Sequence, residues 1–264
     1  MPEKSLWLLS KVESEKSGIG RKQQRKLGFI NMLDKLISVV GNPNGAISKK
    51  LNEIKKHSIN ETDISDHLET LFVESLNVQP KLILELGVRD GDSTFVLERV
   101  AKLWGSEFVS VDIEDCSKAS TYRRWLFVQK DDIEFSKEFE SWCKDRNIYP
   151  KIDVLFVDTS HLFEHTVKEI DSWFPFLSDR AKVFFHDTNL KDNYFRKDGS
   201  IMLGWDNKRG VIKALEKYFN KPFDEETNFV AFINGWLIKH YSCCTGFTIL
   251  EKIDSTIFNS SCTV

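Results

Sequence analysis

The chain has 264 residues, is 41% hydrophobic and 12% aromatic, and carries a formal net charge of −3, so it can bury a sizeable core and shows no global basic signal for nucleic acid. No apolar run reaches the length of a membrane span, and the first residues lack the pattern of a signal peptide. The five cysteines are an odd number, and Cys243 and Cys244 are adjacent, which argues against a disulfide framework and predicts a reducing cytoplasm.

Residues 1–78 lack the alternation of strands and helices that follows them. Apolar residues at helical spacing predict helices near 29–37, 47–54 and 64–72. We expect a helical extension that packs on the main domain or on a partner chain, the second arrangement giving a homo-oligomer. The basic cluster within 21–26 is interpreted as a solvated helix face, because acids are interspersed and no aromatic residues interleave with it.

The most informative stretch is KLILELGVRDGDST, residues 81–94. Its apolar run predicts a strand over 82–86 that is buried on both faces of a parallel sheet. The glycines then predict a turn, and the apolar spacing from Ser93 predicts a helix. We expect Asp92 or Ser93 to cap that helix.

The turn lacks the second glycine of a dinucleotide site, and acids lie near the glycines that it has. Its pattern is E-x-G-x-x-x-G-x-S, from Glu85 through Gly87 and Gly91 to Ser93, with Arg89 inside the turn. A dinucleotide fingerprint needs G-x-G-x-x-G with open N–H groups facing a pyrophosphate. Acid beside the glycines favours a cationic ligand without phosphate, and S-adenosylmethionine fits this description.

Acids also follow the next predicted strands. Asp112 ends the strand 108–111, about 20 residues after Gly91, where a carboxylate reaches ribose hydroxyls. Asp158 follows the strand 152–157, and Asp187 follows the strand 181–185. Two acids at adjacent strand ends can hold a hard divalent cation such as Mg²⁺. His161 is the candidate general base.

Other residues near these strand ends have plainer interpretations. His165 lies four residues after His161 on the same predicted helix face, and it can be a surface residue. His186 can cap or pack. The polar and aromatic loop 189–207 is expected to be an acceptor lid. Strands are predicted at 229–233 and 246–250, joined by a long connection that lines the acceptor pocket or is an ordinary surface loop.

At the residues of the turn, the chain resembles the class I S-adenosylmethionine-dependent methyltransferases. V-D-x-x-H after 152–157 and x-D-T after 181–185 are similar to small-molecule O-methyltransferases of the catechol type and of the macrolide-sugar and cephalosporin-biosynthesis type. The resemblance implies a doubly wound α/β fold, a mostly parallel seven-stranded Rossmann-like sheet. It covers roughly residues 80–252. We therefore expect a helical extension over 1–78, a methyltransferase domain over 79–253 and a polar tail over 254–264.

The resemblance assigns further roles. Asp131 would contact the adenine amino group, although the neighbouring Asp132 leaves the register open. Asp158 would serve the donor, the acceptor and the metal, and Asp187 would be the second metal ligand. Two departures leave the third ligand open. Thr188 stands where the catechol type has asparagine, and His186 stands where the other group has an acid.

We therefore expect methyl transfer from S-adenosylmethionine to an oxygen of a small-molecule acceptor, a sugar or a phenol, with no nucleic-acid or membrane partner. The alternatives are an NAD(P)-dependent oxidoreductase, a non-catalytic or partner-binding protein on the same fold, and methylation of protein or RNA. The chain has no N-P-P-Y-type motif for amine methylation and no broad basic surface, which weighs against methylation of protein or RNA.

Overall fold

The computed structural model describes residues 44–253, so the predicted helix 29–37, the basic cluster within 21–26 and the tail 254–264 lie outside the described residues. The chain divides into two units, residues 1–49 and residues 50–264. The helices are α2 Asn44–His57, η1 Ser65–His67, α3 Leu68–Leu76, α4 Asp92–Trp104, α5 Asp132–Ser136, α6 Phe139–Lys144, α7 Phe163–Trp173, η2 Phe174–Phe176 and α8 Gly210–Phe219. The strands are β1 Leu82–Leu86, β2 Glu107–Asp112, β3 Trp125–Gln129, β4 Ile152–Val157, β5 Leu177–His186, β6 Asn193–Phe195, β7 Ile201–Leu203, β8 Phe229–Ile233, β9 Trp236–Tyr241 and β10 Phe247–Lys252.

Eight of the strands form one sheet in the order β3-β2-β1-β4-β5-β10-β9-β8. The first five strands in this order are parallel, and β10, β9 and β8 continue the sheet in antiparallel fashion. The chain moves outward from β1 to β3 and then returns to the other side of β1 at β4. This reversal opens a crevice at the carboxyl ends of β1 and β4. The predicted doubly wound, mostly parallel fold is confirmed.

The sheet has eight strands where seven were predicted, because β9 occupies most of the predicted connection 234–245. Asn234 and Gly235 both have positive φ, of 51° and 80°, and they form the tight turn between β8 and β9. An Asn-Gly pair between two alternating segments is a strong hairpin signal. Buried and half-buried side chains alternate along β9, as expected for a strand with two unlike faces.

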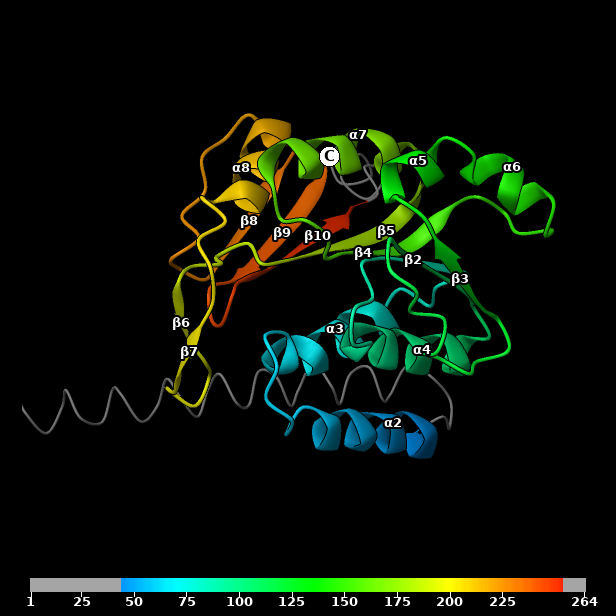
Figure 1. Cartoon of the computed structure of the whole chain (residues 1–264), viewed down its shortest axis with the longest axis horizontal. Helices are drawn as coiled ribbons and strands as arrows, with labels where there is room; N and C mark the ends of the chain where they lie inside the picture. Colours follow the sequence, from blue (N-terminus) through cyan, green and yellow to red (C-terminus); the bar gives the residue numbers. More distant parts are fainter. Residues whose placement is uncertain (1–43, 254–264) are drawn as a thin grey trace, which may run out of the picture. The chain divides into compact units, whose positions relative to one another are not determined.

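Helices cover both faces of the sheet. Figure 1 shows α5, α7 and α8 over one face and α3 and α4 over the other. The apolar side of α4 is completely buried at Val96, Leu97, Val100 and Ala101. On the other face, Leu84, Leu86 and Val109 of the strands belong to one buried cluster with residues of α5, α7 and α8. These faces supply the core that holds the strand ends in fixed positions. Among residues 44–253, no helix is both long and apolar enough to cross a membrane.

Buried ion pairs fasten α3 to the sheet. Glu74 lies 2.6 Å from Nζ of Lys182 on β5 and 3.0 Å from Nζ of Lys239 on β9. All three side chains are largely buried, and removing one partner of such a set leaves a charge uncompensated. This part of the predicted extension therefore packs on the sheet. The predicted domain boundary at 78 and 79 stays a prediction.

Candidate functional site

A cavity of about 510 Å³ lies at the carboxyl ends of β1, β2 and β4, where the strand order reverses. Its wall includes Asp112, Asp131, Asp158 and His165. A cavity of about 70 Å³ shares Asp158 and the turn after β1, and is lined by His161 as well. A larger cavity of about 820 Å³ lies at the opposite edge, where β1 and β4 begin, and contains none of the predicted site residues. Open α/β sheets bind ligands at the carboxyl edge, so the first two cavities form the candidate site.

Asp112 holds the turn after β1 in place. Its Oδ2 accepts hydrogen bonds from the backbone N–H groups of Val88 and Arg89, at 2.7 and 3.1 Å, and its Oδ1 accepts from that of Glu114 at 2.9 Å. These N–H groups are therefore not open to a phosphate. The guanidinium of Arg89 turns away to Asp63, with Nη2 at 2.9 and 2.8 Å from the two carboxylate oxygens.

Gly87 is required by the approach of the neighbouring strand rather than by a ligand. Its φ is +86°, and a Cβ built on it would lie 2.0 Å from the backbone carbonyl oxygen of Asp158. Gly87 N–H donates to the carbonyl of Val111, and Asp158 N–H donates to that of Leu86. The turn is thus packed between the ends of β2 and β4, which fixes Asp158 beside it.

Glu85 lies beneath the turn and does not line either candidate cavity. Its carboxylate accepts hydrogen bonds from the hydroxyls of Ser93, Thr94 and Ser110, at 2.7, 2.8 and 2.6 Å. Burial raises the pKa of Glu85 to about 7, against the lowering effect of these three hydroxyls. The side chain therefore connects β1, β2 and the first turn of α4.

The prediction that Asp92 or Ser93 caps α4 is wrong. The helix begins at Asp92, its N-cap is Gly91 with φ of 85°, and no side chain caps it. Ser93 donates to Glu85 instead. Its hydroxyl serves the buried carboxylate below the turn.

Both acids after β3 lie on the cavity wall, and they have different surroundings. Asp131 is exposed, and its Oδ1 accepts a hydrogen bond from the N–H of Glu134 as the N-cap of α5. Asp132 is buried and directs Oδ1 toward Nε2 of His165 at 3.0 Å. Asp131 is therefore the more exposed of the two acids.

The residues predicted to bind the metal and to act as the base lie close together beside Asp158. His161 Nε2 lies 3.0 Å from Asp158 Oδ1 and 3.2 Å from Asp187 Oδ2. His186 Nδ1 lies 3.1 Å from the same Asp158 oxygen and 3.3 Å from Asp187 Oδ1. His161 and Asp187 both have φ of 57°, a left-handed conformation that costs energy outside glycine and is concentrated at functional sites.

Charge pairing sets the protonation of this cluster. Burial disfavours the charged form of His186, but the carboxylates of Asp187 and Asp158 raise its pKa to about 10. Burial acts against ionisation of Asp158 too, and the two histidines outweigh it, so the pKa of Asp158 falls well below its usual range. The same acids raise the pKa of His161 despite its burial.

The cluster has a donor set that fits a divalent cation. Asp158, His186 and Asp187 each offer one ligand atom, and these atoms lie within 4.8 Å of one another. Oδ1 of Asp187 is buried and accepts no hydrogen bond. One imidazole beside two carboxylates suits Mn²⁺ or Zn²⁺ at least as well as Mg²⁺, which prefers oxygen. Of the two residues left open as third ligand, His186 belongs to this group, whereas the hydroxyl of Thr188 accepts a hydrogen bond from Thr248 at 3.1 Å.

Sequence reasoning did not connect three residues of the same region. The sequence pattern offers Asp132 only as an alternative register for Asp131 and His165 as a surface residue, and it assigns no role to Glu169. His165 and Glu169 are four residues apart on α7, a spacing that places two side chains on one helix face and could have identified the pair.

Residues 84–188 match the sequence model of a family described as a methyltransferase domain. Among solved structures, cofactor-bound Rv0187 from MTB has a TM-score of 0.50 at 14% identity, over 84% of this chain and 97% of that one. The O-methyltransferase TomG from Streptomyces achromogenes, solved with SAM, has a TM-score of 0.48 at 14% identity, over 83% and 95% of the two chains. The MycE methyltransferase of the mycinamycin pathway, solved with Mg, SAH and mycinamycin VI, has a TM-score of 0.48 at 18% identity, over 77% and 53%. No protein with a curated description matches the sequence.

Proposed function

We propose that this chain, a class I S-adenosylmethionine-dependent methyltransferase, transfers the donor's methyl group to an oxygen of a small molecule, a sugar or a phenol. One observation carries the proposal: acids from the ends of β2, β3 and β4 open onto one cavity, and a histidine adjoins its Asp158 side. A cationic donor with a ribose and an adenine matches carboxylates placed in this way.

The donor would lie across the turn after β1. Asp112 accepts three backbone N–H bonds and keeps lone-pair capacity for a ribose hydroxyl. Asp131 is the exposed acid for the adenine edge, and Asp158 stands near the sulfonium end. Gly87, Arg89, Gly91 and Ser93 shape the floor through their backbone, and Glu85 supports that floor through the hydroxyl of Ser93.

The acceptor would lie on the side of His161, and its oxygen would attack the methyl carbon in line with the sulfonium. Holding the two reactants close and aligned supplies most of the rate acceleration. Asp158 and Asp187 hold His161 Nε2 and stabilise the imidazolium, so that Nδ1 is left to take the acceptor proton. Trp205 lies after β7, with its ring centroid 6.0 Å from that of His161, and would border an acceptor ring.

Asp158, Asp187 and His186 would hold a divalent metal, Mg²⁺ or Mn²⁺, next to this acceptor position. When bound, such a metal lowers the pKa of a coordinated hydroxyl. His161 and His186 each lie within 3.3 Å of these two carboxylates.

The turn after β1 weighs against the oxidoreductase alternative. A dinucleotide pyrophosphate needs free N–H groups at this turn, and those of Val88 and Arg89 are already bonded to Asp112. A non-catalytic protein on the same fold is a second alternative. It would not require the strained backbone at His161 and Asp187 beside the cavity.

The cellular setting belongs to the same proposal. Cys116, Cys143, Cys243 and Cys244 are free thiols, which supports a reducing cytoplasm. Self-association through the N-terminal helices stays a prediction.

Transfer of a labelled methyl group tests the function directly. Full-length protein and labelled S-adenosylmethionine are incubated with panels of phenols, sugars, nucleosides and amines, with and without added Mg²⁺ or Mn²⁺. We expect label in an oxygen-bearing small molecule, and less of it after chelation or in Asp187→Asn. Label found only in amines, protein or RNA would contradict the proposed acceptor, and activity unchanged by chelator and by Asp187→Asn would remove the metal.

A further inference from the structure

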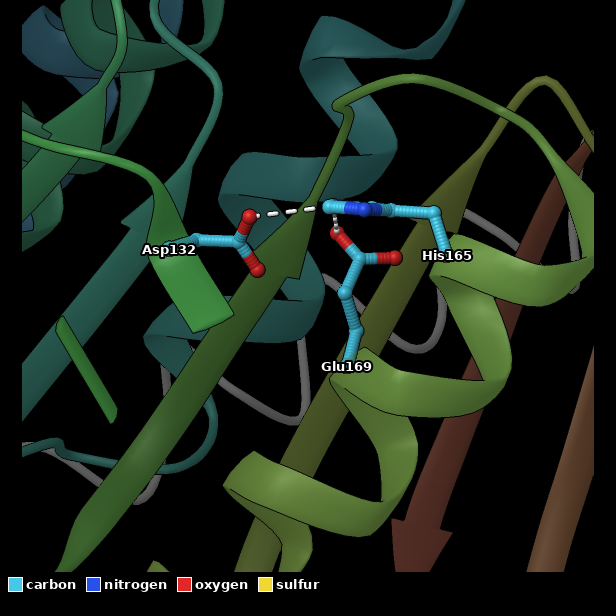
Figure 2. Close-up of side chains that lie close together, drawn as sticks. All are labelled: Asp132, His165 and Glu169. Carbon is cyan, nitrogen blue, oxygen red and sulfur yellow. Dashed lines mark hydrogen bonds and ion pairs between the residues drawn. The ribbon is translucent and has the colours of Figure 1, made fainter. Parts of the chain in front are cut away.

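Three side chains outside the cluster of Asp158 converge between two helices. Asp132 is the first residue of α5, and His165 and Glu169 lie one turn apart on α7. Figure 2 shows the two carboxylates approaching the same end of the imidazole ring from different sides. Their arrangement is fixed by the backbone, since each residue lies within a helix.

The distances match those between the ligands of a metal ion. His165 Nε2 lies 3.0 Å from Asp132 Oδ1 and 3.7 Å from Glu169 Oε1 (Figure 2). Tetrahedral ligands about 2.0–2.1 Å from Zn²⁺ are separated by about 3.4 Å. The two distances bracket that value, and all three donor atoms lie within 4.8 Å of one another.

Hydrogen bonds do not satisfy the two carboxylates. Asp132 is 6% exposed and Glu169 is 2% exposed, and Oδ2 of the first and Oε2 of the second are buried without a hydrogen-bond partner. One imidazolium offsets only one of two buried negative charges.

The surroundings orient the group as an outer shell orients metal ligands. The hydroxyl of Thr159 donates to Glu169 Oε1 at 2.5 Å. Asp132 and His165 both border the 510 Å³ cavity, so a fourth ligand could enter from that side. The group shares no residue with Asp158, His186 and Asp187.

We propose that Asp132, His165 and Glu169 bind a divalent transition-metal ion, Zn²⁺ before Mg²⁺, in a site separate from the proposed acceptor metal. Zn²⁺ readily accepts two carboxylate oxygens and one imidazole nitrogen, whereas Mg²⁺ prefers oxygen ligands. The site does not depend on the proposed methyl transfer.

Zinc binding by full-length variants tests the site. Bound Zn²⁺ is counted by equilibrium dialysis against buffered free metal for wild type, His165→Gln, Asp132→Asn and His57→Gln. His57 is the matched control, because its Nε2 faces a single carboxylate, Asp92, at 2.6 Å. Zn²⁺ binding is also compared between Asp187→Asn and the double variant Asp187→Asn/His165→Gln. This comparison measures the proposed site in a protein whose Asp158 cluster already lacks one ligand. Thiol sites are common to all variants and cancel in each difference.

We expect His165→Gln and Asp132→Asn each to bind one equivalent fewer than wild type, with affinity reduced by at least about tenfold. The same one-equivalent difference should separate Asp187→Asn from the double variant, and His57→Gln should match wild type. Zn²⁺ should also raise the melting temperature of wild type more than that of His165→Gln. Equal Zn²⁺ binding by wild type and by either folded variant, or loss of the equivalent in His57→Gln alone, would overturn the proposal.

Discussion

Gly87→Ala tests how the turn after β1 is built. The residue has φ of +86°, and the new Cβ would lie 2.0 Å from the carbonyl oxygen and 2.8 Å from the carbonyl carbon of Asp158. Real Cβ atoms do not approach backbone this closely, so β1 and β4 must separate at their ends. The positive φ costs about 1–2 kcal/mol. The forced displacement of packed backbone costs about 1–3 kcal/mol more.

Gly235→Ala is the matched control, because Gly235 has φ of +80° and no atom within 4 Å of the position of a Cβ. It should lose only the conformational part of the free energy of unfolding, about 1–2 kcal/mol. Urea denaturation of the two variants and wild type, monitored by circular dichroism, measures both terms. Gly87→Ala should be the less stable variant and should also bind S-adenosylhomocysteine more weakly, since Asp158 lines the cavity. Equal stability of the two variants would refute the proposed close packing of the turn against Asp158.

Three further substitutions address the buried acid, the donor site and the base. Because burial raises the pKa of Glu85 from 4.5 to about 7, the folded state holds its proton more tightly, and the stability that this provides is lost as pH rises toward 7. The stability of wild type relative to Glu85→Gln should therefore fall by about 2.5 kcal/mol from about pH 5 to about pH 8, measured by urea denaturation; a flat difference would contradict the burial of an ionisable carboxyl. Asp112→Asn should weaken S-adenosylhomocysteine binding by about 10- to 100-fold in calorimetry. The control is Asp115→Asn, since Asp115 is an exposed acid that accepts a hydrogen bond from Ser117, and this variant should bind as wild type does. Equal affinities of the two variants would remove Asp112 from the donor site. His161→Gln should lower kcat by about 100- to 10,000-fold while leaving S-adenosylhomocysteine affinity unchanged, and an unchanged kcat would remove it as the base.

The parallel half of the fold could be predicted because each element carries a local signal. The apolar runs at 82–86 and 152–157 predict buried strands, and both are observed as β1 and β4 within these bounds. Strand order places the acids at the ends of β2, β3 and β4 at one edge of the sheet, which is why the sequence groups Asp112, Asp131 and Asp158. The hairpin at Asn234 and Gly235 was missed although the turn residues are present in the sequence.

Contacts between side chains could not be predicted from strand order. The sequence places Glu85 at the strand end, but only packing shows that three hydroxyls surround its carboxylate and separate it from the cavity. Likewise, the distance between α5 and α7 decides whether Asp132 meets His165, and that distance depends on the core between the helices. The requirement for glycine at position 87 also depends on packing. The carbonyl oxygen that a Cβ would meet there belongs to Asp158, 71 residues later in the chain.

The central claim is that the acids at the carboxyl ends of neighbouring strands form a site for a cationic nucleoside donor. Calorimetric titration of the full-length protein with S-adenosylhomocysteine and, separately, with NAD tests it most directly. We predict one S-adenosylhomocysteine bound per chain and no heat of binding with NAD. Binding of NAD without binding of S-adenosylhomocysteine would contradict the claim.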